Sequence, residues 1–340
     1  MTAKKALILV ARVVVSVGML AFLVWKINDS KNGHGHDRIL PPFTGTTVAW
    51  LALALALTFL SVVVSSLRWR AVLEALEVDH VPPLTRLVSL YLAGLFVGNV
   101  LPSTIGGDVL RVSRLSHDLG SDTPASFASV VLERLTGWLV LPVLTLAGFT
   151  INRGFLREHH SRTVALLIAC GTLALLAIVS YLLVHPRIGG RLGSSEGWRR
   201  FAGAVHYGSD HLRRHPARGL RVVAWGFLYQ LILVTAAYSA ARTLSAEAIG
   251  YTAMLTYFPV VLIAQVLPIS ISGLGVREGL FVLFLHPLGV PNGKSVALGI
   301  LIYLLTLGVS LFGAPAFALG AKGGQRHSSP PSPEASTART

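Results

Sequence analysis

The sequence predicts an all-α polytopic membrane protein, and three observations support that class. Only 13% of the 340 residues are charged, about half the charged fraction of a typical soluble domain. Hydrophobic residues make up 53% of the chain, and the mean hydropathy is +0.65. The apolar residues fall in blocks of about 20, the length of helix that crosses a bilayer core of about 30 Å. These observations exclude an ordinary soluble globular domain.

Six apolar runs are each long enough to form a membrane-spanning helix. They cover residues 6–25, 48–67, 124–150, 164–184, 222–241 and 295–320. The first run follows Lys4 and Lys5, as in a signal peptide, but it is longer than a typical signal-peptide core and no clean cleavage site follows. We therefore expect six full spans, with the first one retained.

Two further apolar regions, residues 84–115 and 251–290, are interrupted by proline and glycine. The loop 185–221 carries eight arginines against Glu196 and Asp210, so the positive-inside rule places it in the cytoplasm, together with the basic N-terminus. Both placements hold only if 84–115 enters the membrane and returns to the cytoplasmic side. By the same count, 251–290 returns to the outer side. The sequence thus predicts two oppositely oriented re-entrant hairpins beside the six spans.

The two interrupted regions contain copies of one motif at a constant offset of 166 residues. Asn99-Val-Leu-Pro-Ser-Thr-Ile-Gly-Gly-Asp-Val-Leu-Arg111 aligns with Gln265-Val-Leu-Pro-Ile-Ser-Ile-Ser-Gly-Leu-Gly-Val-Arg277. Proline and glycine predict a helix break in each copy, and a break at membrane depth must be buried in protein or line a wet cavity. Paired breaks indicate an inverted repeat with a substrate site between its halves. The alternative is that these residues only kink helices for packing.

The repeated motif supplies the candidate substrate-binding residues. A helix that restarts after each break directs backbone N–H groups at an anion, and arginine binds phosphate bidentately. The candidates are Arg111, Arg277, Asn99, Gln265, Gly106, Gly107, Gly273 and Gly275. Arg111 and Arg277 are expected to hold the phosphate of one shared headgroup.

A second set of ionisable residues lies beside or within apolar runs, and we interpret it as charge-balancing. It comprises Asp108, Glu133, Arg134 and Glu278. A charge deep in a span costs about 2.5–3.5 kcal/mol even on the lenient insertion scale, so these groups should pair or face water. Arg111 and Arg277 are the expected partners of Glu133. The alternative is a set of static salt bridges that only orient the helices.

Composition and spacing argue against several other function classes. The formal charge is +14, but the basic residues crowd into inter-helix loops without interleaved aromatic residues, so no nucleic-acid partner is expected. Cys170 is the only cysteine, and His34-Gly-His36-Asp37 lacks further ligands, so we expect no metal and no cofactor. No nucleophile accompanies the embedded carboxylates, so we expect that the protein is not an enzyme.

Four ordered motifs make the sequence resemble a known family. They are Ser66-Leu-Arg-Trp-Arg70, Gly98-Asn-Val-Leu-Pro-Ser-Thr-Ile-Gly-Gly-Asp-Val-Leu-Arg111, Leu132-Glu-Arg134 and Pro268-Ile-Ser-Ile-Ser-Gly-Leu-Gly-Val-Arg-Glu278. Over about residues 5–320 the chain resembles the lysylphosphatidylglycerol synthase transmembrane region, or flippase-like, family. The resemblance implies a membrane unit similar to one that moves aminoacylated phosphatidylglycerol between leaflets. The synthase half is absent from the sequence, so we expect a stand-alone membrane member.

We therefore expect a flippase-like transmembrane domain over residues 1–320 and a disordered cytoplasmic tail, rich in Ser, Pro and Thr, over 321–340. The expected function is to move an anionic phospholipid or lipid-linked headgroup between leaflets by alternating access. The expected location is the bacterial cytoplasmic (inner) membrane, with both termini cytoplasmic and a membrane lipid as substrate; the oligomeric state is left open. The alternative is a non-transporting membrane partner of an envelope-lipid or glycolipid biosynthetic enzyme.

Overall fold

The computed structural model describes residues 44–100, 106–120, 123–157, 159–184, 203, 215–265 and 273–318. All regular secondary structure within these ranges is helical. The expected span 6–25, both proline-containing breaks, most of the loop 185–221 and the tail 321–340 lie outside the described residues.

Within the described residues, five helices are long and apolar enough to cross a membrane. They are α2 (Gly45–Ala75), α5 (Thr123–Ile151), α6 (His159–Val184), α9 (Pro216–Thr243) and α12 (Asn292–Leu311). Each overlaps one of the six predicted runs, so the all-α membrane class is confirmed. The total of six spans stays a prediction, because residues 6–25 are not described. Two short 3₁₀ helices follow α5 and α11, at Arg153–Arg157 and His286–Leu288.

Each interrupted region forms two short helices. The first gives α3 (Leu84–Val100) and α4 (Gly106–Asp118), and the second gives α10 (Tyr251–Gln265) and α11 (Val276–Leu285). The order long, short, short, long therefore occurs twice, in a first set (α2, α3, α4, α5) and a second set (α9, α10, α11, α12). Corresponding helices of the two sets begin 167–171 residues apart, close to the offset between the two motifs.

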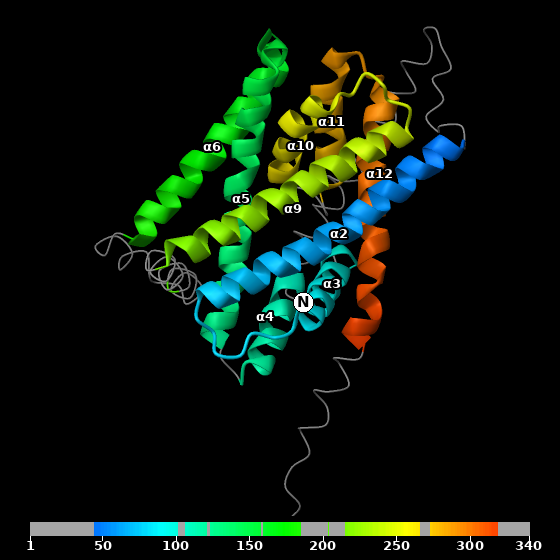
Figure 1. Ribbon diagram of the computed structural model, residues 1–340. Coiled ribbons are helices and arrows are strands. Elements are labelled where there is room, and N and C mark those ends of the chain that lie inside the picture. The colour runs from blue at the N-terminus through cyan, green and yellow to red at the C-terminus, as the bar shows by residue number, and fades with distance from the viewer. Residues whose placement is uncertain are drawn as a thin grey trace, which may run out of the picture.

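Helices α2 and α9 run side by side in opposite directions (Figure 1). Toward one end, the Trp50 ring meets the Tyr238 ring edge-to-face with 6.2 Å between centroids. Toward the other end, Glu74 forms an ion pair with Arg221. Most residues that α9 buries near its C-terminal end are alanine or serine, which lets helix backbones approach closely in a membrane. This long pair joins the first set to the second.

Helix α10 is enclosed by the rest of the protein. Residues 253–261 are all buried. Tyr257 stacks on Phe284 of α11 with 4.9 Å between ring centroids, and Phe258 stacks on Phe281 at 6.2 Å. Phe149 of α5 meets the Tyr257 ring edge-to-face. A helix that is apolar on every side belongs in the interior of a bundle, so aromatic stacking anchors α10 and α11 there.

Helices α3 and α4 approach to backbone contact. A Cβ atom at Gly107 would collide with the carbonyl group of Gly94, and a Cβ atom at Gly94 would lie 2.9 Å from the Arg111 side chain. At the other end of the pair, Arg86 Nε and Asp118 Oδ2 are 2.8 Å apart. The first residues of α3 therefore lie beside the last residues of α4, and the two helices form an antiparallel pair.

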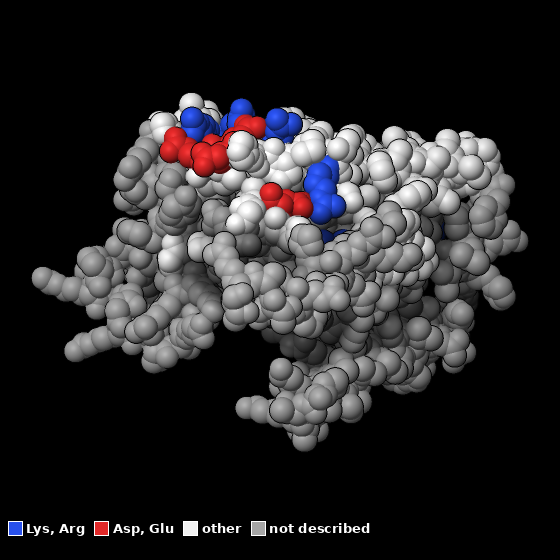
Figure 2. Space-filling model, turned by 90° about the horizontal axis from the view of Figure 1, so that it is seen from below, with Lys and Arg blue, Asp and Glu red and all other residues white. Residues whose placement is uncertain are grey.

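One face of the molecule carries acidic and basic side chains next to one another (Figure 2). Two ion pairs join the end of α2 to the start of α9, Glu77–Arg218 at 3.0 Å and Glu74–Arg221. A third, Arg70–Glu74 at 3.0 Å, lies within α2. Charged clusters of this kind belong in water or among lipid headgroups. They therefore mark one end of the membrane-crossing helices.

Candidate functional site

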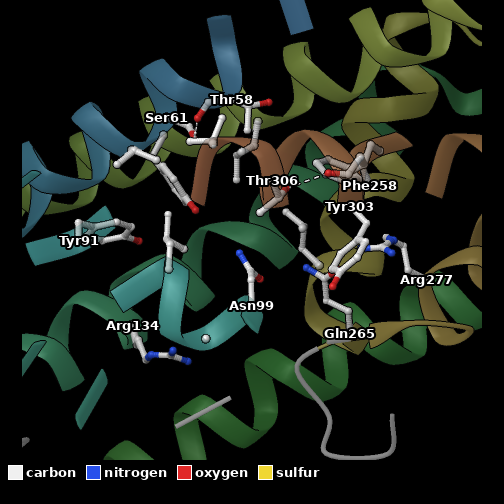
Figure 3. A pocket seen from close by; sticks show the side chains of 18 residues that line it. Thr58, Ser61, Tyr91, Asn99, Arg134, Phe258, Gln265, Arg277, Tyr303 and Thr306 are labelled. Carbon is white, nitrogen blue, oxygen red and sulfur yellow. Dashed lines mark hydrogen bonds between the residues drawn. The ribbon is translucent and has the colours of Figure 1, made fainter. Parts of the chain in front are cut away.

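A cavity of about 310 Å³ lies between the two helix sets. Its lining comes from α2, α3 and α5 of the first set and from α9, α10, α11 and α12 of the second. The polar lining side chains are Thr58, Ser61, Tyr91, Asn99, Arg134, Tyr229, Gln265, Arg277, Tyr303 and Thr306. Figure 3 shows Arg134, Asn99, Gln265 and Arg277 along one side of this space. The cavity thus collects residues that are far apart in sequence.

Asn99 and Gln265, the first residues of the two motif copies, both line the cavity. Asn99 lies near the end of α3, and Gln265 is the last residue of α10. The buried Nδ2 atom of Asn99 has no hydrogen-bond partner among the described residues. Gly273, at φ +72°, passes so close to α10 that a Cβ atom there would lie 2.6 Å from Gln265 Cβ. Glycine is needed at 273 for both the dihedral angle and the space.

Arg277 reaches the cavity from the start of α11 and pairs with its neighbour Glu278. Its Nε and Nη2 atoms donate to Glu278 Oε1 at 3.1 and 2.7 Å, and its guanidinium lies 5.4 Å from the centre of the Tyr303 ring. The other carboxylate oxygen of Glu278 accepts from the backbone N–H of Gly275 at 2.6 Å. Glu278 therefore balances Arg277 and caps the N-terminus of α11.

Glu133 of α5 is the centre of a buried charge cluster in the first set. Its side chain is almost fully buried and accepts hydrogen bonds from Arg68, from Ser65 at 3.1 Å and from Nη1 and Nη2 of Arg111 at 3.2 Å each. Of the two partners expected for Glu133, Arg111 is therefore found. Arg277 pairs with Glu278 instead.

Arg111 lies behind the cavity and not among the described residues that line it. Its guanidinium sits 4.1 Å from the centre of the Trp69 ring and 4.3 Å from that of Tyr91, and the residue is 5% exposed. Asp108 Oδ1 is 3.7 Å from Arg111 Nη1, while Asp108 Oδ2 is 2.6 Å from Arg134 Nε. Arg134 is therefore the member of the first set's charge cluster that lines the cavity.

The remaining candidates, Gly106 and Gly107, begin α4 and do not line the cavity within the described part of the chain. Gly107 permits the close contact with α3 described above. Gly275, at φ +85°, precedes α11 and presents its N–H to Glu278. Within the described residues, no group of three His, Cys, Asp or Glu side chains is placed to hold a metal ion.

A family model described as the lysylphosphatidylglycerol synthase TM region matches residues 9–313. The chain belongs to this family. The match confirms the resemblance carried by the four motifs. A UPF0104 membrane protein from Methanothermobacter thermautotrophicus is 26% identical over 161 residues, which are 47% of this chain and 45% of that protein. The chain thus spans less than half the length of that relative.

In this member of the lysylphosphatidylglycerol synthase TM-region family, Arg68 belongs to the buried cluster although it was not a candidate site residue. The predicted run ends at residue 67 because a charge interrupts the apolar pattern there. Helix α2 continues to Ala75, and Arg68 turns inward to Glu133. Gly137 of α5 makes room, since a Cβ atom there would lie 2.8 Å from Arg68 Nη1. The available signal was a basic residue two positions after a pair of serines in an otherwise apolar run.

Proposed function

We propose that this protein is a lipid transporter that moves an anionic headgroup between the two leaflets by alternating access. The observation that carries the proposal is the cavity between the helix sets, where Arg134 and Arg277 enter from opposite sets together with Asn99 and Gln265. Guanidinium and amide groups donate hydrogen bonds, so this lining suits a phosphate. Charged side chains at membrane depth cost free energy to insert, and they typically mark substrate pathways.

The proposed transport cycle uses an inverted repeat. Its support is the recurrence of the helix order and of the motif, together with the antiparallel pairing of α3 with α4. In the proposal, α3 and α4 enter from the cytoplasm, whereas α10 and α11 enter from the outer side. Both termini are cytoplasmic, and the protein lies in a bacterial cytoplasmic membrane. Movement of one set against the other would open the shared cavity to each leaflet in turn.

The two motif arginines have different roles in this proposal. Arg277 contacts the phosphate directly, because it lines the cavity. Arg111 holds the cluster that positions Arg134, because its guanidinium is enclosed by Trp69 and Tyr91 and bonded to Glu133. Asp108 and Glu278 neutralise Arg134 and Arg277 when no substrate is bound.

The test is translocation of a fluorescent phosphatidylglycerol in reconstituted vesicles, together with thermal stability of the same samples. Arg277→Lys keeps the charge but loses the planar fork, and a charge-assisted contact contributes about 1.5–3 kcal/mol. Translocation per folded molecule should fall about ten- to a hundredfold. Arg111→Lys should mainly lower thermal stability. Arg86→Lys, in the exposed pair with Asp118, is the matched control and should change neither quantity.

Two outcomes would contradict the proposal in different ways. If Arg277→Lys transports at the wild-type level per folded molecule, the cavity is not the headgroup site. If the wild-type protein moves none of a panel of anionic lipids, the alternative of a non-transporting partner of a lipid-synthesising enzyme gains support.

A further inference from the structure

We propose that the end of α12 is the cytoplasmic gate of the cavity, that Arg114 of α4 holds this gate shut, and that the phosphate of an anionic lipid opens it by binding Arg114. The inference rests on the proposed function and adds a lipid contact outside the described cavity lining. The gate segment comprises residues 309–318, which are the last residues of α12 and the helical turn that follows. It belongs to the second helix set and lies against α3 of the first (Figure 1).

The gate segment closes one wall of the cavity. Val309 packs with Val62 of α2 and Leu92 of α3 in a small buried apolar cluster. Val62 and Val309 also line the cavity. Helix α3 begins beside the end of α4, at the proposed cytoplasmic side, and reaches the cavity at Asn99. Because Leu92 lies between these two points, the cluster separates the cavity from the cytoplasmic side.

Backbone contact seats the gate segment on α3. A Cβ atom at Gly313 would lie 2.1 Å from the carbonyl oxygen of Leu92. Four residues further on, the Phe317 ring lies 6.0 Å from the Phe96 ring, measured between centroids. The closed contact therefore needs glycine at position 313, and a side chain there would hold the gate segment away from α3.

The gate segment is held less firmly than α10, which also belongs to the second set. Phe312 meets Phe59 of α2 edge-to-face with 5.9 Å between centroids, but these two rings are 65% and 39% exposed. By contrast, α10 meets α5 through Tyr257 and Phe149, which are both buried. A segment with few buried apolar contacts opens at low cost. Movement between the sets is therefore expected at the gate segment, while the contact of α5 with α10 persists.

Arg114 fastens the gate segment to α4. Its Nη1 and Nη2 atoms donate to the backbone carbonyl oxygens of Ala316 and Phe317 at 2.8 Å each. Its guanidinium also lies 5.6 Å from the centre of the Phe317 ring. No carboxylate among the described residues forms an ion pair with Arg114. The positive charge of this half-buried residue is therefore available to an anion.

A lipid phosphate is a stronger acceptor than the two carbonyl groups, because it is charged and accepts both guanidinium N–H groups at once. It can take these N–H groups only after the carbonyl bonds break, so it binds the open state in preference to the closed one and shifts the equilibrium toward opening. Arg114 lies one turn before Asp118, which pairs with Arg86 at the end of the helix pair. Arginine in this position is attracted to anionic lipids in the cytoplasmic leaflet.

The experiment measures closure of the gate without measuring transport. In a Cys170→Ala background, Phe59→Cys and Phe312→Cys are combined and treated with a short bifunctional methanethiosulfonate reagent, which joins them while the gate segment is closed. Vesicles of phosphatidylcholine alone are compared with vesicles that also contain phosphatidylglycerol. Crosslinking should be about three- to tenfold slower with phosphatidylglycerol, the effect of one or two net hydrogen bonds. Inorganic phosphate added to phosphatidylcholine vesicles should leave the rate unchanged, because it is not held at the membrane surface.

Two variants test the role of Arg114. Arg114→Gln removes the latch and the phosphate contact together, so crosslinking should be slow in phosphatidylcholine, and phosphatidylglycerol should have no further effect. Arg70→Gln is the matched control. It removes an arginine that pairs with Glu74 within α2, so the rate and its dependence on phosphatidylglycerol should stay as in the wild type.

Two further comparisons test the gate segment itself. Gly313→Ala should slow crosslinking in phosphatidylcholine without a change of charge, whereas Gly308→Ala should not, because its added Cβ atom meets nothing within 4 Å. Cysteines in place of Trp50 and Tyr238, another edge-to-face ring pair between the two sets, should crosslink equally in both lipid mixtures. That pair lies on α2 and α9, outside the gate segment.

The last measurement joins the gate to transport. Translocation of a fluorescent lipid should stop when the cysteines at 59 and 312 are crosslinked, and a reducing agent should restore it. Full transport by the crosslinked protein would overturn the gate. Equal crosslinking in both lipid mixtures, or an undiminished effect of phosphatidylglycerol on Arg114→Gln, would overturn the binding of lipid phosphate at Arg114. If crosslinking responds to phosphatidylglycerol through Arg114 but the wild-type protein moves no lipid, the proposed function fails and the lipid-responsive latch stands.

Discussion

Glu278 occupies the space that a side chain at Gly299 would fill. A Cβ atom at Gly299 of α12 would lie 2.9 Å from both Cγ and Oε1 of Glu278. Gly299 follows Glu133 of α5 by the motif offset of 166 residues. Each helix set thus pairs its motif arginine with a buried carboxylate, but the carboxylate comes from α5 in the first set and from α11 in the second. The helix that supplies the buried carboxylate therefore differs between the two sets.

The first prediction concerns Gly299→Ala. The added methyl group must displace Glu278, which neutralises Arg277 and caps α11. Inserting a methyl group into a packed core typically costs about 1–3 kcal/mol, so the thermal midpoint of the purified protein should fall. Gly279→Ala is the control, because nothing lies within 4 Å of its added Cβ atom and helical alanine is favourable. Equal midpoints for the two variants would show that Glu278 has room to move.

The second prediction concerns the buried carboxylate of Glu133. Glu133→Gln leaves the charges of Arg68 and Arg111 without their shared partner. Removing one member of a buried ion pair typically costs about 3–5 kcal/mol. The free energy of unfolding in denaturant should fall by that amount, and adding Arg68→Met should restore part of it.

The control for this prediction is Glu74→Gln, which removes a partly exposed carboxylate from the charged face. Exposed ion pairs contribute up to about 1 kcal/mol, so this change should be small. A combined variant with Arg277→Met in place of Arg68→Met should give no rescue, because Arg277 pairs with Glu278. If Arg277→Met restores the stability of Glu133→Gln and Arg68→Met does not, the pairing of Glu133 with Arg68 is contradicted.

Hydropathy was sufficient to predict where the long helices lie, because about 20 apolar residues have few alternatives to a membrane-crossing helix. It failed at Arg68, where a charge looked like the end of a span but is neutralised by Glu133 inside the bundle. The pairing of Arg111 with Glu133 was predictable, since a buried charge needs an opposite charge. Which arginine reaches the cavity was not predictable. That depends on how the helices pack: Arg134 of α5 lines the cavity, whereas Arg111 of α4 is enclosed by Trp69 and Tyr91.

The third prediction concerns the contact between α3 and α4. Gly107→Ala places a methyl group against the Gly94 carbonyl, and backbone cannot give way as a flexible side chain can. The two helices should separate, and protease resistance and thermal midpoint should both drop. Gly98→Ala on α3 is the control for stability, because its added Cβ atom meets nothing within 4 Å. If Gly107→Ala is as stable as Gly98→Ala, the close approach of α3 and α4 is not required for the fold.

The last prediction concerns orientation in the membrane. The charged face should be cytoplasmic, because it includes the arginines that begin α9 and the ends of α3 and α4. His117 near the end of α4 is exposed there, whereas Glu247 is exposed in the connection between α9 and α10, beyond the other end of α9. In a Cys170→Ala background, His117→Cys should react with a membrane-impermeant maleimide only after cells are opened. Glu247→Cys should react in intact cells. If α3 and α4 crossed the bilayer as one span, His117 would lie on the outer side. Labelling of His117→Cys in intact cells would therefore disprove the re-entrant arrangement. The unsubstituted Cys170→Ala protein gives the baseline.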